Sequence, residues 1–428
     1  MRVSRDTATG LGHDSIGRLV RRAMTAVAAV LGLVLGLVLA AAGPGGTDAA
    51  AQDLRFFRIG TGTTGGTYFP IGGLIANAIS GPPGAPPCEL GGSCGVPGLI
   101  AVAQASSGSV ENIANIRAGR IESALVQADV ATWAQTGTGL YDDGGALPGL
   151  RAIAHLYGET VHLVVPADSP VQTTADLPGL RVSLGAPGSG TLIDARKVLE
   201  VYGLDEDDVD ARHLHPEVAA DAMLEGELDA FFFVGGAPLL AIEDLARRMP
   251  IRLVPFDDPA VDRLLAEQPF FVRDELPADV YPGVPAVNIV EVGAQWVTAA
   301  DVDEETVYGI TRALWHPTTQ AVLDNNHPRG REIRVEDALR GLAIPVHPGA
   351  LRYYREIGLV DGEGGVSEAE VPPDTDEAAP TGHEGEPADS RGLDAPDRGV
   401  RPGPAGDVEE TGAVRVPNPF VDAFRGGG

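Results

Sequence analysis

Short apolar runs with β-strand character alternate with helix-like segments through the middle of this sequence, and this alternation restricts the fold more than any other feature. The run FFRIG (56–60) precedes a helix-like stretch over 67–80, and LRVSLG (180–185) precedes another over 191–203. Such alternation is typical of α/β proteins whose mainly parallel sheets are covered by helices on both faces. The length of the alternating region predicts two lobes of ordinary domain size.

The two ends of the chain differ from this middle part. Arg18, Arg21 and Arg22 precede an apolar run over 26–42 that is followed by small residues, the pattern of a cleaved signal peptide. An uncleaved membrane anchor is the alternative, and the Arg21–Arg22 pair leaves the general and the twin-arginine export routes open. From Asp361 onward the sequence is rich in Pro, Gly, Asp and Glu, which predicts disorder.

These contrasts predict the domain organisation and the location. We expect a signal peptide and linker at 1–51, a first lobe from 52–165 with its return and C-terminal helices at 257–360, a second lobe at 166–256, and a disordered acidic tail at 361–428. A signal peptide predicts a periplasmic protein.

Charge and cysteine content narrow the function further. The chain carries 60 acidic residues against 31 basic ones, and Lys197 is its only lysine. This balance argues against a nucleic-acid partner and against docking on an anionic membrane. Cys88 and Cys94 are the only cysteines, and in an exported protein they predict one local disulfide. Two thiolates without a nearby histidine make a poor zinc site, so we expect no metal and no cofactor.

Two glycine-rich loops each lead into a helix-like segment. Gly66, Thr67 and Tyr68 end the first loop, and Ser189, Gly190 and Thr191 end the second. Glycines allow the backbone to approach a ligand, and the unpaired amides of a helix start favour an anion. An ordinary capped turn explains either loop alone, but two such loops, one in each lobe, favour a shared anion site.

Two further segments supply polar candidates. Ser109 could cap a helix, and Asn112 would then lie one turn further on, facing the same rim or solvent. The apolar run LVQAD ends in Gln127 and Asp129, at the end of a strand where side chains reach the ligand crevice of α/β proteins. Gln127 could contact a ligand, whereas Asp129 could meet an ammonium group or cap the next helix.

Taken together, seven segments resemble the TAXI-type solute-binding proteins of tripartite ATP-independent periplasmic (TRAP) transporters. These segments are GTGTTGGTYFPIGG, GSVENIANIRAG, VQADVA, HLVVPADS, RVSLGAPGSGT, LDAFFFVGG and VHPGALRYYREIG, in that order from Arg58 to Gly358. The resemblance implies a monomeric, two-lobed periplasmic binding protein, not an enzyme, that closes around a small carboxylate. It further implies delivery of that ligand to a TRAP membrane permease, with glutamate or a related amino acid favoured and a dicarboxylate as the alternative.

The predicted ligand site combines the loop residues with one aromatic wall. Phe232 is the ring expected to line the pocket, Phe231 and Phe233 are expected in the core, and Tyr157 and His162 are expected near the crossover between lobes. The full set of predicted ligand-binding residues is Gly66, Thr67, Tyr68, Ser109, Asn112, Gln127, Ser189, Gly190, Thr191 and Phe232. A carboxylate needs less positive charge than a triphosphate, so the absence of lysine from these loops suits it.

Two other functions remain as alternatives. An exported hydrolase is disfavoured because Pro187 replaces the first glycine of a G-x-S-x-G motif around Ser189. His213 and His215 could bind a metal, but their acidic, polar surroundings favour a solvated connection. A binding protein that signals to a receptor, instead of supplying a permease, would share the same loops.

Overall fold

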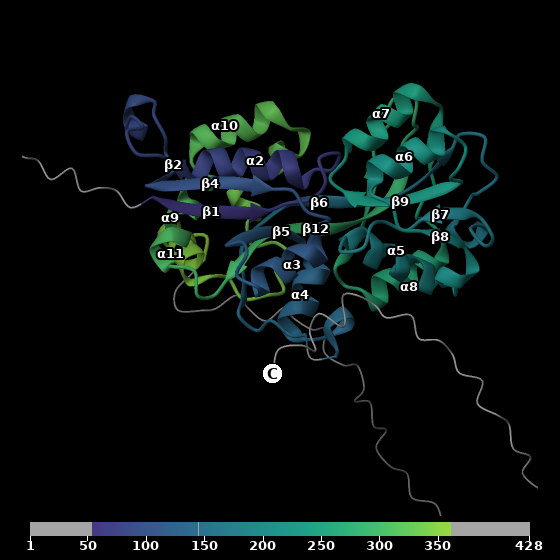
Figure 1. The fold of residues 1–428 in the computed structure, drawn as a ribbon, viewed down its shortest axis with the longest axis horizontal. Helices are drawn as coiled ribbons and strands as arrows, with labels where there is room; N and C mark the ends of the chain where they lie inside the picture. Colours follow the sequence, from purple (N-terminus) through teal and green to yellow (C-terminus); the bar gives the residue numbers. More distant parts are fainter. Residues whose placement is uncertain (1–53, 144, 361–428) are drawn as a thin grey trace, which may run out of the picture. The chain divides into compact units, whose positions relative to one another are not determined.

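The computed structural model describes residues 54–143 and 145–360, and the signal peptide and the acidic tail expected from the sequence lie outside these residues. The main sheet has ten strands and the order β4-β1-β5-β12-β6-β9-β7-β8, with β10 on β6 and β11 on β12 (Figure 1). These strands are β1 (Arg55–Gly60), β4 (Leu99–Gln104), β5 (Ser123–Gln127), β6 (Leu150–Pro166), β7 (Arg181–Ser183), β8 (Asp210–Arg212), β9 (Ala230–Gly235), β10 (Ile251–Leu253), β11 (Phe271–Leu276) and β12 (Val287–Ala299). The short strands β2 (Ser80–Gly81) and β3 (Val96–Pro97) pair separately.

Helices cover both faces of this sheet, so the predicted α/β class is confirmed. They are α2 (Tyr68–Ile79), α3 (Ser109–Arg117), α4 (Ala128–Thr136), α5 (Gly190–Val201), α6 (Pro216–Leu224), α7 (Leu240–Arg248), α8 (Pro259–Glu267), α9 (Glu304–Leu314), α10 (Pro317–Asn326) and α11 (Pro348–Glu356). Short 3-10 turns include η1 (Cys88–Leu90), η2 (Gly139–Tyr141) and η5 (Pro328–Arg331).

Parallel pairing is confined to the two outer parts of the sheet. Strands β4, β1 and β5 are parallel to one another, as are β9, β7 and β8. The central strands β12 and β6 are antiparallel to each other and to their neighbours. The expectation of mainly parallel sheets therefore holds only for the outer parts. We call the part with β1, β4 and β5 the β1 side, and the part with β7, β8 and β9 the β9 side.

The period-2 alternation of strand side chains separates the cores on the two faces. On β9, Phe232 packs in a cluster with α5 and α8, whereas Phe231 and Phe233 pack in another with α6 and α7. On β5, Leu125 packs towards α2 and Val126 towards α3 and α4. Helices consequently sandwich the sheet on the β1 side and on the β9 side (Figure 1).

The boundaries between the lobes remain a prediction. The packing of α8 concerns the last of these boundaries, between residues 256 and 257. Val261 and Leu264 of α8 belong to the same core cluster as Val198 of α5. The chain just after residue 257 thus packs on the β9 side.

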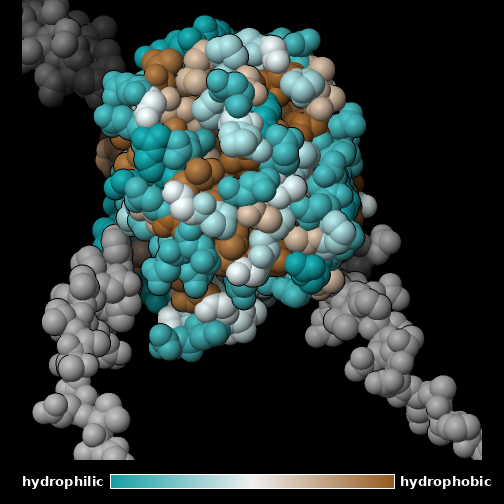
Figure 2. Space-filling view, turned by 90° about the vertical axis from the view of Figure 1, so that its right-hand side faces the viewer, coloured by the Kyte–Doolittle hydropathy of each residue, from teal (hydrophilic) through white to brown (hydrophobic). Residues whose placement is uncertain are grey.

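The surface of the β9 side is mainly hydrophilic (Figure 2). Figure 2 looks onto the end that bears the β9 side and shows apolar residues in small patches between hydrophilic ones. Among the described residues, none of the helices combines the length and the apolar character that crossing a bilayer requires.

Candidate functional site

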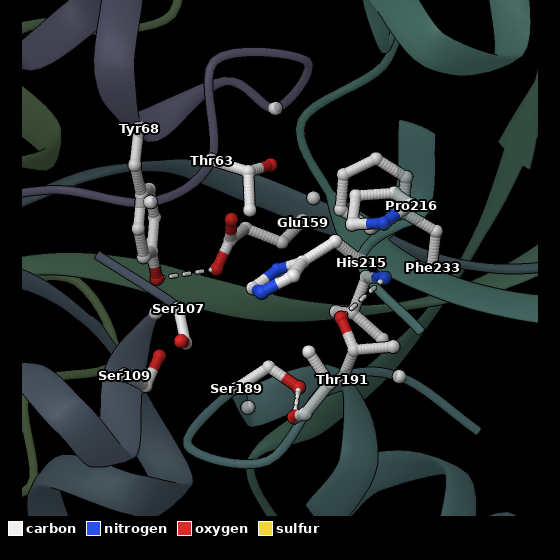
Figure 3. Close-up of a pocket in the computed structure, with 18 of the residues that line it drawn as sticks. Thr63, Tyr68, Ser107, Ser109, Glu159, Ser189, Thr191, His215, Pro216 and Phe233 are labelled. Atoms are coloured by element: carbon white, nitrogen blue, oxygen red, sulfur yellow. Dashed lines mark hydrogen bonds between the residues drawn. The ribbon is translucent and has the colours of Figure 1, made fainter. Parts of the chain in front are cut away.

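A small cavity lies where the β1 side meets the β9 side and several helices begin (Figure 3). Its volume is about 50 Å³, well above the roughly 10–15 Å³ that a single water molecule needs. The lining residues come from both sides of the sheet and are Gly62, Thr63, Gly66, Thr67, Tyr68, Ser107, Gly108, Ser109, Gln127, Glu159, Gly185, Ala186, Ser189, Gly190, Thr191, Leu214, His215, Pro216, Phe232, Phe233, Val234 and Gly235.

The structure gathers most of the predicted site residues around this cavity. All of the predicted residues except Asn112 line it, although they come from segments more than 160 positions apart. Phe233 lines it together with Phe232, and Phe231 lies in the core. That these residues bind a ligand stays a prediction.

Asn112 has a different role. Its side chain is fully buried, and its Nδ2 donates to the backbone oxygens of Thr61 at 2.7 Å and Leu125 at 2.9 Å. The Asn112 Oδ1 accepts from the Ser106 hydroxyl at 2.8 Å. Asn112 therefore joins the end of β1 to β5 beneath the cavity, because its position on α3 turns it towards the sheet and away from the rim.

The hydroxyl groups at the helix starts are already engaged within the protein. Ser189 Oγ accepts from the Leu192 amide at 3.1 Å, which makes Ser189 the N-cap of α5. Thr191 Oγ1 accepts from the Val234 amide at 3.1 Å. Capping and strand contacts thus account for both side chains, and the backbone amides at the start of α5, which have no intrahelical partner, are the groups left to meet an anion.

Thr67 contributes a contact between the two sides. Its Oγ1 donates to the backbone oxygen of Gly236 at 2.5 Å, and the Gly65 amide donates to Glu217 Oε1 at 2.6 Å. The Glu111 amide likewise donates to the Gly188 oxygen at 3.0 Å. These three hydrogen bonds hold the loops from the β1 side and the β9 side together around the cavity.

Gly190 lies against the side chain of Gln127. A Cβ at position 190 would lie 1.3 Å from Gln127 Oε1, so any larger residue there would force the Gln127 side chain to move. The Gln127 Nε2 donates to Asp194 Oδ2 at 2.7 Å, and its Oε1 accepts from the Ser109 hydroxyl at 3.3 Å. Gln127 therefore spans from α3 on the β1 side to α5 on the β9 side at the cavity wall.

Glu159 is a site residue that the sequence analysis missed. It lies in the middle of β6, is 2 % exposed, and its Oε2 accepts from the Tyr68 hydroxyl at 2.7 Å (Figure 3). Burial raises the pKa of Glu159 to about 8, although the hydrogen bond from Tyr68 acts to lower this pKa. The signal was present, because a glutamate inside the apolar run LYGETVHLVV needs a partner or a ligand.

His215 lies beside the cavity, which the sequence analysis did not predict. Its side chain is exposed, as expected for a solvated connection, but it also precedes α6 and lines the cavity, with its ring between Glu159 and Thr191 (Figure 3). His213 does lie on the surface, with its Nε2 3.2 Å from Glu206 Oε2. The two histidines therefore have different surroundings.

Asp129 fills neither of the roles considered for it. It does not line the cavity, and the N-cap position of α4 belongs to Gln127. It is fully buried, and neither of its carboxyl oxygens has a well-aligned hydrogen-bond donor among the described residues, although the backbone amides of Asp129 and Val130 act to lower its pKa. Its surroundings are considered below.

His162 and Tyr157 both lie on β6. His162 Nδ1 is 3.0 Å from the Phe233 oxygen and its Nε2 is 2.9 Å from the Tyr281 hydroxyl, and burial lowers its pKa to about 3. Tyr157 is fully buried, and its hydroxyl has no hydrogen-bond partner in the described part of the chain. These contacts give His162 a structural role.

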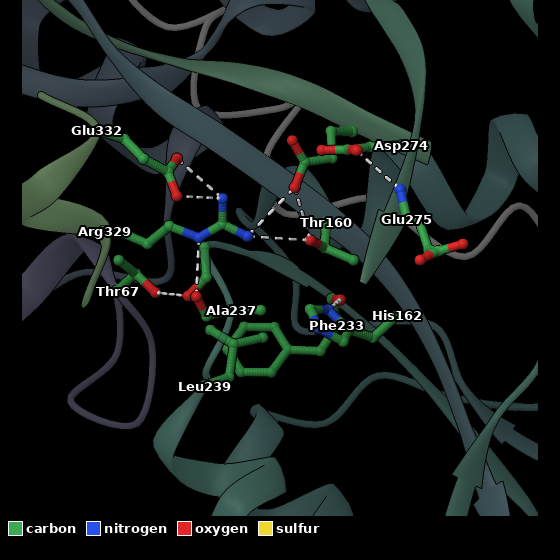
Figure 4. Close-up of polar contacts among 12 residues, drawn as sticks. Thr67, Thr160, His162, Phe233, Ala237, Leu239, Asp274, Glu275, Arg329 and Glu332 are labelled. Carbon is green, nitrogen blue, oxygen red and sulfur yellow. Dashed lines mark hydrogen bonds and ion pairs between the residues drawn. The ribbon is translucent and has the colours of Figure 1, made fainter. Parts of the chain in front are cut away.

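A buried arginine lies close behind the cavity. Arg329 of η5 donates from Nε to the Ala237 oxygen at 2.8 Å and from Nη2 to Glu291 Oε1 at 3.2 Å (Figure 4). Its Nη1 also pairs with Glu332 at 2.9 Å. Arg329 thus ties η5 to β12 and to the loop after β9, and it is absent from the cavity lining. The lining contains neither arginine nor lysine, and Glu159 is its carboxylate.

The cysteine pair forms the predicted disulfide, with the Cα atoms 4.6 Å apart. Fold topology brings a histidine to it that the local sequence does not show, because His316 Nε2 lies 3.6 Å from Cys88 Sγ. The disulfide uses both sulfurs, and none of the three residues lines the cavity.

A protein-family model covers most of the described region. Residues 59–358 match the model of the NMT1-like family. The chain belongs to the NMT1-like family.

Solved structures with related folds are distant from this NMT1-like protein. The periplasmic aliphatic sulphonate binding protein SsuA from Escherichia coli is 14 % identical over 70 % of this chain and 78 % of its own, with a TM-score of 0.35. A protein of Bordetella bronchiseptica RB50 is 16 % identical over 71 % and 81 %, with a TM-score of 0.42. The substrate binding protein of an amino acid ABC transporter is 12 % identical over 64 % and 99 %, with a TM-score of 0.37. Similarities at this level do not identify a ligand for this chain.

Proposed function

We propose that this NMT1-like protein is an extracytoplasmic solute-binding protein that captures a small carboxylate ligand. The observation that carries the proposal is the convergence of helix starts from both sides of the sheet on one small cavity. The starts of α2 and α3 reach it from the β1 side, and those of α5 and α6 reach it from the β9 side. Backbone amides at such positions bind an anion without a basic side chain.

Within this proposal, the cavity favours an amino acid over a dicarboxylate. Glu159 lines the cavity and the lining supplies no arginine or lysine, so a second ligand carboxylate would face a like charge or a buried acid. An ammonium group would instead pair with Glu159, while the ligand carboxylate meets the amides of Gly190 and Thr191. An amino acid related to glutamate that carries a single carboxylate, such as glutamine, is therefore favoured over glutamate, whose side chain is itself a second carboxylate.

The resemblance of the loops to TAXI-type proteins supports delivery of the ligand to a TRAP membrane permease. A periplasmic location and a monomer follow from the same proposal. The alternative is a binding protein that reports its ligand to a signalling receptor, for which the cavity would be the same. Hydrolysis is less favoured, since among the described residues no hydrogen bond joins His215 to a serine hydroxyl, and Ser189 Oγ donates to the Ala186 oxygen at 2.7 Å.

Glycine substitutions test the location of the site. A thermal-shift screen of amino acids and dicarboxylic acids would identify a ligand through the rise in melting temperature, and calorimetry would then compare Gly190→Ala with Gly73→Ala. A Cβ at 190 displaces Gln127, whereas a Cβ at 73 meets no atom within 4 Å. We expect Gly190→Ala to weaken binding at least tenfold and Gly73→Ala to leave it unchanged. Equal affinity of folded Gly190→Ala and wild type would place the ligand elsewhere.

A charge substitution tests the class of ligand. Glu159→Gln removes the carboxylate and keeps an acceptor for the Tyr68 hydroxyl. We expect it to weaken amino-acid binding about tenfold or more, since a hydrogen bond to a charged group contributes about 1.5–3 kcal/mol. Dicarboxylic acids should bind Glu159→Gln at least as well as the wild type. Tighter binding of amino acids to the variant would contradict the proposed role of Glu159.

A further inference from the structure

A pair of buried carboxyl groups connects the two sides of the sheet below the cavity. Asp129 lies at the start of α4, whose Val130 packs in the core of the β1 side. Asp194 lies in α5, whose Val198 packs in the core of the β9 side. Both side chains are fully buried, and their carboxyl groups lie within hydrogen-bonding reach of each other.

The hydrogen bonds around this pair are incomplete. Asp194 Oδ2 accepts from Gln127 Nε2 at 2.7 Å. Asp194 Oδ1 and both oxygens of Asp129 have no well-aligned donor among the described residues, and the nearby backbone amides of Asp129 and Val130 only partly offset the effect of burial on the pKa of Asp129. An ionised carboxylate can only accept hydrogen bonds, so two ionised groups would leave three buried oxygens without well-aligned donors. One proton between the two groups supplies the missing donor.

The surrounding charges do not replace that proton. Glu159 of β6 faces both aspartates, and Tyr141 of η2 faces Asp129, with the Arg117 guanidinium 5.6 Å from the centre of the Tyr141 ring. In the part of the chain that the structure describes, no ion pair includes Asp129 or Asp194. The neighbouring Glu159 instead acts to raise the pKa of Asp194.

Electrostatics favours the same protonation state. Two carboxylates that share a buried site cannot both ionise near neutral pH, because each is desolvated and repels the other. Burial raises the pKa of Asp194, and the neighbouring Asp129 raises it further. Burial also raises the pKa of Asp129.

We propose that Asp129 and Asp194 form a proton-binding site that joins α4 to α5, so that the arrangement enclosing the cavity carries one proton on this pair at neutral pH. Separation of the two sides would hydrate both groups and release the proton. The enclosed arrangement is consequently favoured as the pH falls towards the ordinary range of a carboxyl group. The site does not depend on the identity of the ligand, so ligand-free protein tests it.

Aspartate-selective ¹³C labelling with nuclear magnetic resonance measures the protonation directly, because glutamates such as Glu159 are then silent. We expect one aspartate carboxyl carbon of the wild type to titrate with a midpoint above pH 7. In Asp194→Asn that midpoint should disappear and Asp129 should titrate at least one pH unit lower. The surface variant Asp207→Asn is the matched control and should keep the high midpoint. A wild type whose aspartates all titrate below pH 5, or a high midpoint that survives in both Asp129→Asn and Asp194→Asn, overturns the proposal.

Urea unfolding provides a second measurement. A proton held by the native state and not by the unfolded chain makes the unfolding equilibrium constant rise up to tenfold per pH unit. In Asp194→Asn the new amide can donate to Asp129 and accept from Gln127, so its stability relative to wild type should rise at least tenfold between pH 6 and pH 8. No change in this ratio would contradict a shared proton. The NMR titration should also be repeated with sodium replaced by choline at constant ionic strength. A shift of the high midpoint by more than one pH unit would contradict a shared proton, since a metal cation would then occupy the pair.

Discussion

The hydroxyl of Tyr68 lies 2.7 Å from Glu159 Oε2, although the two residues are 91 positions apart. Tyr157 lies beside the same carboxylate, two residues before it on β6, and its buried hydroxyl has no hydrogen-bond partner among the described residues. One buried tyrosine hydroxyl thus stabilises the glutamate and the other does not.

This difference predicts that replacing each tyrosine by phenylalanine has a different effect on the free energy of unfolding. Tyr68→Phe removes a hydrogen bond to a buried acid and should lower the free energy of unfolding by about 1–3 kcal/mol. Tyr157→Phe removes a hydroxyl with no partner and should leave that free energy unchanged or raise it slightly. Urea denaturation of the two variants gives both values, and equal destabilisation would rule out the Tyr68–Glu159 contact as described.

The raised pKa of Glu159 predicts a pH dependence of stability. With a native pKa of about 8 against an ordinary value of 4.5, the native state holds a proton that the unfolded chain releases at neutral pH. Stability should therefore fall as the pH rises from 6 to 8, by up to about 1.4 kcal/mol per pH unit from this group. Glu159→Gln removes this contribution, so its stability relative to wild type should increase over the same range. Parallel pH profiles of the two proteins would show that Glu159 is ionised in the folded state.

We expect replacement of Arg329 to lower the free energy of unfolding. Its guanidinium is the cation beside Glu291, which is 7 % exposed. Arg329→Gln leaves that buried carboxylate without a counter-charge and should cost about 3–5 kcal/mol of unfolding free energy. Arg334→Gln is the control, because Arg334 and Asp324 form a partly exposed pair at 2.7 Å that should contribute less than about 1 kcal/mol. The double variant Arg329→Met/Glu291→Met should recover much of the loss, and a loss as large as in Arg329→Gln would mean that the pair is not its cause.

The disulfide should affect stability and spare the cavity. Cys88 and Cys94 close a loop with a sequence separation of 6 residues. On the chain-entropy estimate, closing so short a loop contributes about 2 kcal/mol. We expect Cys88→Ser/Cys94→Ser to unfold at lower urea concentration and to keep the thermal-shift profile of the wild type towards the ligand found in the screen. Loss of ligand binding in the folded double variant would connect this loop to the site.

Local patterns were enough to predict the parts of the cavity that lie at helix starts. Glycines and hydroxyl residues next to an apolar helix pattern, as at Thr67 and Ser189, mark such positions within a few residues. What the local pattern does not contain is the partner: Thr67 meets Gly236, which is 169 positions away. Asn112 was misplaced for a related reason, since a small rotation of α3 decides whether its side chain meets a ligand or the carbonyls of Thr61 and Leu125.

The polar residues inside apolar strands and helices were harder to assign. Glu159 and Asp194 look like interruptions of a buried pattern, and their roles depend on Tyr68, Gln127 and Asp129 from other elements. The antiparallel centre of the sheet was also missed, because the sequence of β6 alone gives no information on the direction of its neighbours.

The continuity of β6 and β12 determines the mechanics of the molecule. Both strands pass from one side to the other without a break, so the sides are joined by a stiff two-stranded ribbon that allows twisting and bending but resists sliding. The register of β6 on β12 shifts between Ala294 and Gln295 and again between Trp296 and Val297. Irregularities of this kind locally interrupt the ladder and increase its twist. Both shifts fall where β12 also pairs with β5, from Ala294 to Thr298, so β5 supports the ribbon along its other edge at the positions where its ladder is irregular.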